Sequence, residues 1–407
     1  MNTTPTSSRL HIAIFGRRNA GKSSLINALT NQEVAIVSDI AGTTTDPVSK
    51  AMEILPIGPV VIIDTAGLDD VGPLGKMRIR KTYEVLNKTD LAILVIDGTE
   101  GVTEFEEKIL KAIREKNIPL IGVINKKDLL NHSQSQKKEW EKRLNLKLIE
   151  VSAKDKEGIE ELKMAIIKKA SSDESVKLVG DLIKAGDLVV LVIPIDKAAP
   201  KGRLILPQQQ TIRDILDSGA MALVVKDTEL EEAFNKIKDK PSLVITDSQV
   251  FNKVGTIVPS NVSLTSFSIL FARYKGDLEE LVRGVRAIKN LKDGDKVLIA
   301  EGCTHHRQED DIGTVKIPRW LRQKTGKDLQ FKWSSGMTFP EDLETCSLIV
   351  HCGACMLNRK EMLYRISYAK ERGIPIVNYG ILIAYVNGLF PRAIEIFKEA
   401  KKIYEEE

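Results

Sequence analysis

The sequence predicts an α/β protein built from three consecutive α/β domains, and three observations support this prediction. Apolar segments with the composition of buried strands alternate with helical segments, over 407 residues that are too many for one core. A small polar stretch, ASSDES at 170–175, separates a first set of these segments from the rest, and all four cysteines lie after residue 300. The predicted domains are therefore residues 1–172, 173–268 and 269–407.

Composition and charge exclude several classes of protein. Charged residues make up 29% of the chain, apolar residues 43%, and the formal net charge is +4, a balance typical of globular proteins. No run of basic residues is dense enough for a nucleic-acid-binding stripe, and no apolar segment is long enough to span a bilayer. The N-terminus does not have the pattern of a signal peptide. We therefore expect a cytoplasmic protein with no membrane or nucleic-acid partner.

The first domain opens with a phosphate-binding motif. The buried-strand pattern LHIAIFG runs directly into GRRNAGKSS at 16–24, and a helical segment follows. This matches G-x-x-x-x-G-K-[ST], in which backbone N–H groups and a helix N-terminus bind phosphates. Lys22 is expected to contact the β- and γ-phosphates, and Ser23 to bind Mg²⁺. The predicted phosphate-binding residues are Gly16, Asn19, Ala20, Gly21, Lys22, Ser23 and Ser24.

Three later motifs complete a guanine nucleotide site. In VVIIDTAG, an apolar strand ends at Asp64, which is expected near Mg²⁺. Gly67 follows in the next loop and is expected to reach the γ-phosphate. In NKKD, the Asp128 carboxylate accepts two hydrogen bonds that guanine donates and adenine does not, which discriminates by on the order of ten-thousandfold. SAK at 152–154 closes the base pocket, so the first domain is predicted to be a P-loop GTPase that binds GTP and GDP. The predicted base-pocket residues are Asn125, Lys126, Asp128, Ser152, Ala153 and Lys154.

These motifs resemble those of the Era and MnmE branch of the translation-factor-related small GTPases. The segment DIAGTTTDP is similar to the switch I motif of that branch, which implies Thr44 as the magnesium-binding threonine, with Thr43 as the alternative. Leu68 follows DTAG where Ras-type enzymes carry a water-orienting Gln, so slow intrinsic hydrolysis is expected. The resemblance further implies that Asn19 helps to bind K⁺ in place of an arginine finger. The predicted catalytic residues are Lys22, Asn19 and Thr44.

The second domain carries strands and helices without a catalytic pattern. The strand segments LVVLVIPI, MALVV and LVIT alternate with the helical segments QQTIRDILDS and ELEEAFNKIKD. The polar loop IDKAAPKGRL between them is typical of a strand-to-helix connection. We therefore predict that this domain mediates dimerisation.

Three apolar strands of the third domain end in loops with metal-binding residue types. The strands are KVLIAEG, SLIVHCG and IPIVNYG, and ligands of open parallel sheets gather outside the carboxyl ends of the strands. The loops are therefore expected to converge on one site. In a reducing cytosol, clustered cysteines predict metal binding more than disulfides, whereas Cys346 is expected to be a buried thiol. The candidate residues are Glu301, Cys303, His305, His306, His351, Cys352, Cys355, Asn378 and Tyr379.

Spacing alone leaves two kinds of metal site open. The pattern Cys-x-His with His-Cys-x-x-Cys supplies enough thiolates and imidazoles for a structural zinc site. Alternatively, Cys303, Cys352 and Cys355 hold an iron–sulfur cluster whose fourth position is filled by a weaker ligand.

The whole chain resembles the family of GTPases that take part in the maturation of [FeFe]-hydrogenase. The resemblance lies in the C-x-H motif, a 45-residue spacer and the H-C-x-x-C motif behind the GTPase domain, and in HHRQEDDIGTVKIPRWL. It implies a [4Fe-4S] cluster on the three cysteines, with His305, His351 or Glu301 as the exchangeable fourth ligand. It also implies a homodimeric scaffold that carries a diiron precursor, built with two radical-SAM maturases, to the apo-[FeFe]-hydrogenase.

A GTPase with a structural zinc site, acting in RNA or ribosome-related processes, is the alternative. The likeness to Era and MnmE favours it, but no KH-type GXXG loop or aromatic-basic platform follows residue 172. The sequence leaves open the fourth ligand, the choice of dimer or tetramer, and whether GTP hydrolysis gates cluster transfer or partner release.

Overall fold

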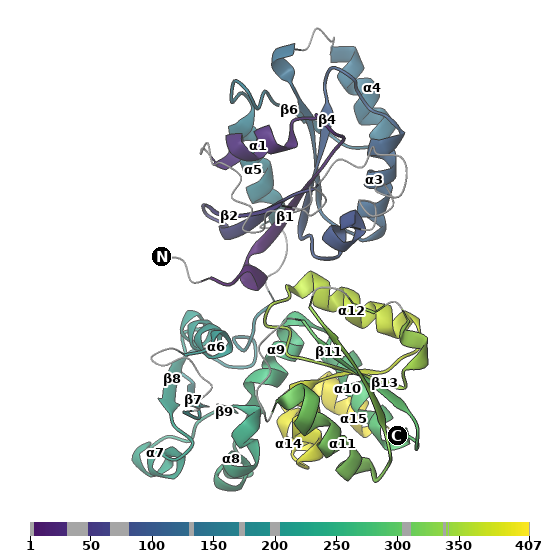
Figure 1. Ribbon diagram of the computed structural model, residues 1–407. Helices are drawn as coiled ribbons and strands as arrows, with labels where there is room; N and C mark the ends of the chain where they lie inside the picture. Colours follow the sequence, from purple (N-terminus) through teal and green to yellow (C-terminus); the bar gives the residue numbers. More distant parts are fainter. Residues whose placement is uncertain are drawn as a thin grey trace. The chain divides into compact units, whose positions relative to one another are not determined.

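The computed structural model divides the chain into two compact units, Met1–Ser175 and Val176–Glu407 (Figure 1). The predicted boundary near residue 172 lies close to the division between them, whereas the predicted boundary at 268 falls inside the second unit and remains a prediction from the sequence pattern. The structure describes residues 4–30, 48–65, 81–129, 134–170, 176–195, 204–302, 311–336, 339–340 and 342–406.

The first unit is a six-stranded sheet with helices on both faces. Its elements are β1 (Leu10–Phe15), α1 (Lys22–Thr30), β2 (Val48–Ile54), β3 (Gly58–Asp64), β4 (Leu91–Asp97), α3 (Glu104–Glu115), β5 (Leu120–Asn125), α4 (Gln134–Leu144), β6 (Leu148–Glu150) and α5 (Ile159–Ala170). The strand order is β2-β3-β1-β4-β5-β6, in which β2 runs antiparallel to β3 and the other pairs are parallel. Helices α1 and α5 cover one face, and α3 and α4 cover the other (Figure 1).

The apolar run of β1 serves both faces of this sheet. Ile12 and Ile14 pack in one hydrophobic cluster with Leu25 of α1, whereas Ala13 and Phe15 pack in the cluster on the opposite face. Alternate side chains of a strand point to opposite faces, so a central strand covered on both sides has to be apolar at every position. The continuous apolar pattern seen in the sequence therefore places β1 in the centre, where its carboxyl end leads into the phosphate-binding loop.

The second unit contains two four-stranded parallel sheets. Their strand orders are β10-β9-β7-β8 and β12-β11-β13-β14. The elements are β7 (Leu188–Val192), α6 (Leu206–Asp217), β8 (Met221–Val225), α7 (Leu230–Lys236), β9 (Leu243–Thr246), α8 (Phe251–Ile257), β10 (Ser263–Ser266), α9 (Phe267–Lys275), α10 (Leu278–Ala287), β11 (Lys296–Glu301), a π-helical turn (Ile312–Lys316), α11 (Ile317–Thr325), β12 (Gln330–Ser335), β13 (Leu348–His351), α12 (Arg359–Glu371), β14 (Ile376–Asn378), α13 (Tyr379–Val386), α14 (Phe390–Ala393) and α15 (Lys398–Glu405).

One hydrophobic core joins the two sheets of the second unit. The same buried cluster includes Val190 and Val244 of the first sheet and Ile299 and Val350 of the second. Helix α9, which directly follows β10, packs against α6 and also against α12 and α13. The second and third predicted domains are therefore not separated by a break in the core.

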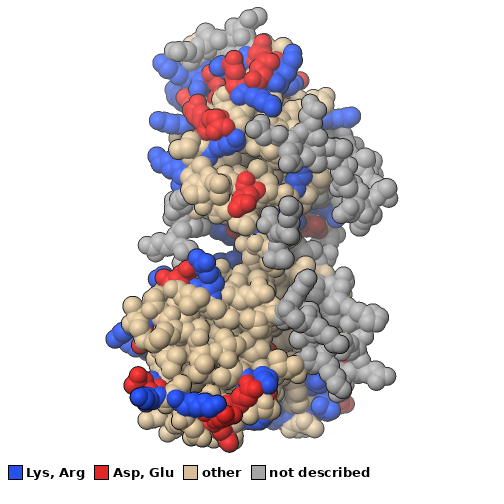
Figure 2. Space-filling view, turned by 90° about the vertical axis from the view of Figure 1, so that its left-hand side faces the viewer, with Lys and Arg blue, Asp and Glu red and all other residues tan. Residues whose placement is uncertain are grey.

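Strand β8 is an exposed apolar edge of the first of these sheets. Met221 is 55% and Val224 44% exposed, and Leu216 of the neighbouring α6 is also exposed. Figure 2 shows a broad surface without charged side chains on the side of the second unit that carries β8, α6 and α7, with charged residues around it. Long apolar edges are rare on monomers because they invite pairing with another chain.

No helix within the described residues has the length and apolar character that crossing a bilayer requires.

Candidate nucleotide site and candidate cluster site

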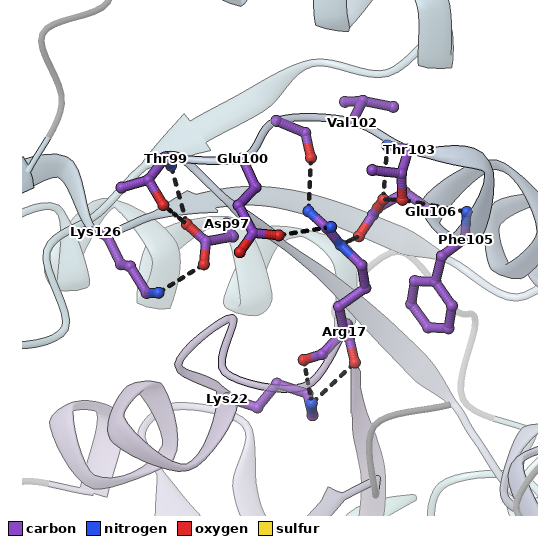
Figure 3. A network of polar contacts seen from close by, with 12 residues as sticks. Arg17, Lys22, Asp97, Thr99, Glu100, Val102, Thr103, Phe105, Glu106 and Lys126 are labelled. Carbon is purple, nitrogen blue, oxygen red and sulfur yellow. Dashed lines mark hydrogen bonds and ion pairs between the residues drawn. The ribbon is translucent and has the colours of Figure 1, made fainter. Parts of the chain in front are cut away.

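The phosphate-binding loop connects β1 to α1 and closes around the ammonium group of Lys22. Lys22 Nζ donates hydrogen bonds to the carbonyl oxygens of Gly16, at 2.8 Å, and Arg17, at 2.7 Å (Figure 3). The residue is only 8% exposed. Gly16 approaches β4 so closely that a Cβ atom there would lie 2.5 Å from the Val95 carbonyl oxygen. The loop therefore holds a buried cation at the position where the motif places the phosphates.

The two predicted magnesium-binding residues of the described chain lie together. Ser23 Oγ donates a hydrogen bond to Asp64 Oδ2 at 2.7 Å, and Asp64 ends β3, the strand that pairs with β1. A hydroxyl and a carboxylate at this spacing fit a site that binds Mg²⁺ together with phosphate oxygens. The other predicted contacts of this part of the site, Thr43, Thr44 and Gly67, lie outside the described residues.

The base pocket is formed by the loops that follow β5 and β6. Ser152 Oγ donates a hydrogen bond to Asp128 Oδ1 at 2.8 Å, which orients the carboxylate predicted to bind guanine. Lys126 has a left-handed backbone, with φ 66°, and its Nζ lies 2.6 Å from Asp97 Oδ2. Burial alone would raise the pKa of Asp97, but hydrogen bonds from Lys126 and Thr99 lower it below its usual value. Asp97 thus remains an anion that holds Lys126 in place.

Asn125 joins the phosphate-binding loop to the base pocket. Its Nδ2 donates to the Ala20 carbonyl oxygen at 3.0 Å, and its Oδ1 accepts from the Ala153 N–H at 3.1 Å. A Cβ atom on Gly21 would lie 2.2 Å from Asn125 Nδ2, so the glycine makes room for this contact. The buried amide therefore acts between the two loops that contact the nucleotide.

Arg17 was not identified from the sequence, yet it fixes the start of the phosphate-binding loop (Figure 3). Its Nε donates to Glu106 Oε1 at 3.0 Å and its Nη1 to Glu100 Oε2 at 2.7 Å. Glu106 is fully buried and also accepts from the Thr103 N–H at 2.8 Å, which completes the capping box of α3. The Thr-x-x-Glu pattern at 103–106 was the signal available in the sequence.

Two further predicted residues of the nucleotide site are exposed side chains. Asn19 has φ 62°, in the left-handed region that Asn tolerates better than most residues. Its role in binding K⁺ stays a prediction. Lys154 is exposed after β6, at the rim of the base pocket.

The candidate cluster site lies at the carboxyl edge of the second sheet of the second unit. In the parallel register, His351 of β13 lies opposite Ala300 of β11 and opposite Asn378 of β14. The strand ends therefore converge, as the three strand-to-loop patterns predict. The buried Asn378 accepts a hydrogen bond from the Ile381 N–H at 2.8 Å and caps α13.

Cys352 occupies an environment suited to a thiolate ligand. Its Sγ accepts hydrogen bonds from the Gly302 N–H at 3.1 Å and the Ala354 N–H at 3.4 Å. Ala354 has φ 53°, a left-handed conformation that is rare for a residue with a side chain. Burial raises the pKa of the Cys352 thiol, and the two N–H donors oppose that rise. Hydrogen bonds to sulfur are a recognised means of tuning iron–sulfur clusters, so Cys352 fits this role.

Cys355 is exposed, whereas Cys346 is buried. Cys346 precedes β13, at the opposite end of the strand from Cys352, and is therefore placed away from the carboxyl edge, as a buried thiol. Cys303, His305 and His306 lie outside the described residues. Within the part of the chain that the structure describes, no group of three His, Cys, Asp or Glu side chains is arranged to hold a metal ion.

His351 does not fit its predicted role as an exchangeable ligand. It is fully buried, and its two ring nitrogens lie 2.9 Å from the Cys352 carbonyl oxygen and 3.1 Å from Arg365 Nη1. Because the carbonyl only accepts and the guanidinium only donates, Nδ1 carries the proton and Nε2 accepts. Burial, reinforced by Arg365, lowers the pKa of His351 to about 3. The spacing had placed His351 beside Cys352 but could not reveal Arg365.

Glu301 keeps its place among the candidate ligands. Its side chain is buried at the end of β11, and its Oε1 accepts a hydrogen bond from the Tyr379 hydroxyl at 3.2 Å. Burial, and then the nearby Glu301, raise the pKa of Tyr379 far above its usual value. Tyr379 is therefore a hydrogen-bond donor that orients the carboxylate.

Two family models match the second unit. Residues 178–276 match the hydrogen maturase F dimerization domain, and residues 279–396 match the hydrogen maturase F tetramerization domain. The chain belongs to the hydrogen maturase F family. The part matched to the tetramerization domain lies within residues 269–407, which we predicted to be the cluster-binding domain. In this member of the hydrogen maturase F family, residues 11–126 match the model of the 50S ribosome-binding GTPase, so the first unit is a GTPase domain.

Curated relatives and solved structures are similar to that GTPase domain. The tRNA modification GTPase MnmE of Nitrosomonas europaea is 39% identical over 162 residues, 40% of this chain and 35% of the relative. The GTPase Der of Mycoplasmopsis pulmonis is 42% identical over 141 residues, 34% of this chain and 32% of the relative, so the chain spans about a third of the length of these relatives. A structure of an Aquifex aeolicus Era variant bound to GDP.AlF4- is 23% identical, with a TM-score of 0.35, over 53% of this chain and 92% of that chain.

Proposed function

We propose that this GTPase is a cytoplasmic scaffold and carrier in the maturation of [FeFe]-hydrogenase, and that Cys303, Cys352 and Cys355 bind a [4Fe-4S] cluster. A diiron precursor is then received from two radical-SAM maturases and delivered to the apo-[FeFe]-hydrogenase. The observation that carries this proposal is the Cys352 sulfur with its two backbone N–H donors, in a chain of the hydrogen maturase F family.

The residues of the cluster site have distinct parts in this proposal. Cys352 and Cys355 act as thiolate ligands at the carboxyl edge of the sheet, and Tyr379 orients the Glu301 carboxylate. When bound, a cluster with three cysteine ligands supplies one iron with an exchangeable position. Glu301 or His305 is the proposed fourth ligand, because both ring nitrogens of His351 are engaged.

The nucleotide site supplies the timing signal of the scaffold. GTP or GDP binds with Mg²⁺ at Ser23 and Asp64, and Thr44 completes the magnesium site in the GTP state. Asn19 would help to hold K⁺, which would supply positive charge at the phosphates in place of an arginine finger. Release of the γ-phosphate then frees the switch segment.

The exposed edge of β8 supports a homodimer as the form of the scaffold. Its exposed apolar side chains, and its place at the edge of the sheet among the described strands, provide both elements of a strand-to-strand interface. The residues of β8 lie within 178–276, the part of the chain that matches a dimerization domain.

Anaerobic reconstitution with iron and sulfide tests the cluster proposal. We expect about four irons per chain, visible absorption and an EPR signal after reduction. Cys352→Ser is expected to abolish the cluster signal, because a serine hydroxyl is a poor ligand for iron–sulfur clusters. Cys346→Ser is the matched control and is expected to retain it, since Cys346 is buried before β13.

The same measurement separates the proposal from its alternative. One tightly bound zinc per chain without a cluster signal would instead indicate a GTPase with a structural metal site. Copurification of RNA with such a protein would support the role in RNA or ribosome-related processes.

Replacement of Val224 by lysine tests the homodimer. We expect Val224→Lys to weaken self-association by on the order of a hundredfold or more, because the ammonium loses hydration at an apolar interface without gaining a partner. Sedimentation of the full chain over a range of concentrations measures this change. Met164→Lys changes an exposed methionine of α5 in the GTPase domain and serves as the control. Equal dissociation constants for both variants would place the interface elsewhere.

A further inference from the structure

The carboxyl end of α9 is tied to the loop that carries two of the proposed cluster ligands. This segment, residues 352–357, is here termed the cysteine loop. Lys275, the last residue of α9, donates from Nζ to the carbonyl oxygens of Ala354 and Leu357, each at 2.9 Å, and of Cys355 at 3.4 Å. The residue is only 3% exposed. A single buried side chain therefore contacts three carbonyl groups of the loop backbone.

A second contact joins the two segments in the opposite direction, from the residue that begins the helix after the cysteine loop. Arg359, at the start of α12, donates from Nη1 to the carbonyl oxygens of Arg273 and Tyr274 at the end of α9. Arg273 in turn forms an ion pair with Asp181, near the start of the second unit. The cysteine loop and the end of α9 are thus connected by hydrogen bonds from Lys275 to the loop and from Arg359 to the helix.

The geometry also identifies Lys275 as a positive charge. Three carbonyl oxygens surround Nζ, and only an ammonium group has three N–H donors to satisfy them. Buried lysines are rare unless their charge is compensated. Burial lowers the pKa of Lys275 to about 8, and electrostatic interaction with Cys355 and Cys352 opposes this shift. Lys275 and Cys352 also line the same small cavity, so the ammonium group lies in the immediate surroundings of a proposed ligand.

Lys275 also explains how the loop keeps an unfavourable conformation. Ala354 has φ 53°, and its N–H points to the Cys352 sulfur while its carbonyl oxygen accepts from Lys275. Backbone in this region persists only where surrounding contacts impose it. The hydrogen bond from Lys275 fixes the peptide group after Ala354, on the same residue whose N–H donates to Cys352.

We propose that Lys275 is a positioning residue for the cysteine site, which holds Cys352 and Cys355 for metal binding and supplies a positive charge at the cavity that it lines with Cys352. The predicted effect on the reduction potential rests on the proposed cluster function. The positioning role applies to any metal that the two thiolates bind. Lys275 belongs to the part matched to the dimerization domain, and the cysteine loop to the part matched to the tetramerization domain. The charge therefore links two regions that the family models treat separately.

Two substitutions separate the geometry from the charge. Lys275→Met keeps the length of the side chain but removes the charge and all three hydrogen bonds. Lys275→Arg keeps the charge but cannot reproduce a three-carbonyl contact around one nitrogen. Lys296→Met, at an exposed lysine that begins β11, is the control. Circular dichroism of each full-length variant reports on folding.

Cobalt(II) titration of the metal-free full chain measures the positioning role. The absorption of cobalt–thiolate bonds reports binding, and both Lys275 variants are expected to bind Co²⁺ about tenfold to a hundredfold more weakly than the unmodified chain and the control. Unchanged affinity in folded Lys275→Met would overturn the proposal. If that variant does not fold, unchanged affinity in Lys275→Arg does the same.

The reduction potential of the reconstituted cluster measures the role of the charge. Because a nearby cation favours the added electron, Lys275→Met is expected to have a more negative potential, while Lys275→Arg stays close to the unmodified protein. Equal potentials in all four proteins would contradict the electrostatic part. If the unmodified chain assembles no cluster but binds Co²⁺, the proposed function fails while the cobalt titration still decides the role of Lys275.

Discussion

Asp128→Asn is expected to lower the affinity for GTP and GDP by on the order of ten-thousandfold. The carboxylate accepts hydrogen bonds from guanine N1–H and from the exocyclic amino group, whereas an amide places a donor against one of these donors. Ser152 Oγ, 2.8 Å from Asp128 Oδ1, holds the carboxylate in this orientation. Titration with a fluorescent GDP analogue in the presence of Mg²⁺ measures the change.

Asp155→Asn is the matched control for this prediction. Asp155 lies 3.2 Å from the same Ser152 hydroxyl but belongs to none of the four nucleotide-binding motifs. It is expected to bind guanine nucleotides with nearly unchanged affinity. Similar losses in both variants would mean that Ser152, and not the carboxylate of Asp128, dominates base recognition.

Arg365→Met is expected to destabilise the second unit by about 3–5 kcal/mol. The guanidinium is buried and donates to Glu361 Oε1 at 3.0 Å, to His351 Nε2 at 3.1 Å and to the Gly336 carbonyl oxygen at 3.3 Å. It also lies over the ring of Phe339, 5.1 Å from the centroid. The substitution therefore leaves a buried carboxylate without its cation and removes two further hydrogen bonds. Urea unfolding, with hydrogen exchange of β13 and α12 to locate the effect, measures it.

Arg372→Met, at the C-cap of the same helix, provides the comparison. Arg372 directly follows α12 as its C-cap residue, pairs with the exposed Glu344 and lies over the ring of Tyr368, so its loss is expected to cost less than about 1 kcal/mol. In the double variant Arg365→Met/Glu361→Gln, part of the lost stability should return, because the carboxylate that pairs with Arg365 is replaced by a neutral amide. Equal free energies of unfolding for Arg365→Met and Arg372→Met would show that the contacts of the buried arginine contribute no more to stability than those of the exposed one.

The nucleotide site could be predicted closely because its motifs are local. The strand, the loop and the helix follow one another within residues 10–30. The contact between Ser23 and Asp64 follows from the pairing of β1 with β3. Arg17 could not be predicted, since its partners Glu100 and Glu106 lie more than eighty positions away in the sequence.

The cluster site shows the same limit more clearly. The three strand ends were predictable from apolar runs followed by polar loops, and the parallel register brings them to one edge. Which side chains remain available there depends on distant partners, namely Arg365 for His351 and Lys275 for the cysteine loop. The apolar pattern of a strand does not indicate which other elements its side chains pack against. The sequence therefore could not distinguish one common core in the second unit from two separate cores.

That common core has a thermodynamic consequence. Val190 and Val244 of one sheet and Ile299 and Val350 of the other belong to a single buried cluster, so the two sheets cannot lose their packing independently. A ligand that binds only the folded cysteine loop therefore stabilises the β8 edge as well, in proportion to the logarithm of its concentration. Ligand binding at the cysteine loop and the folded state of the β8 surface are therefore linked through the free energy of unfolding. This link requires no change in the folded structure.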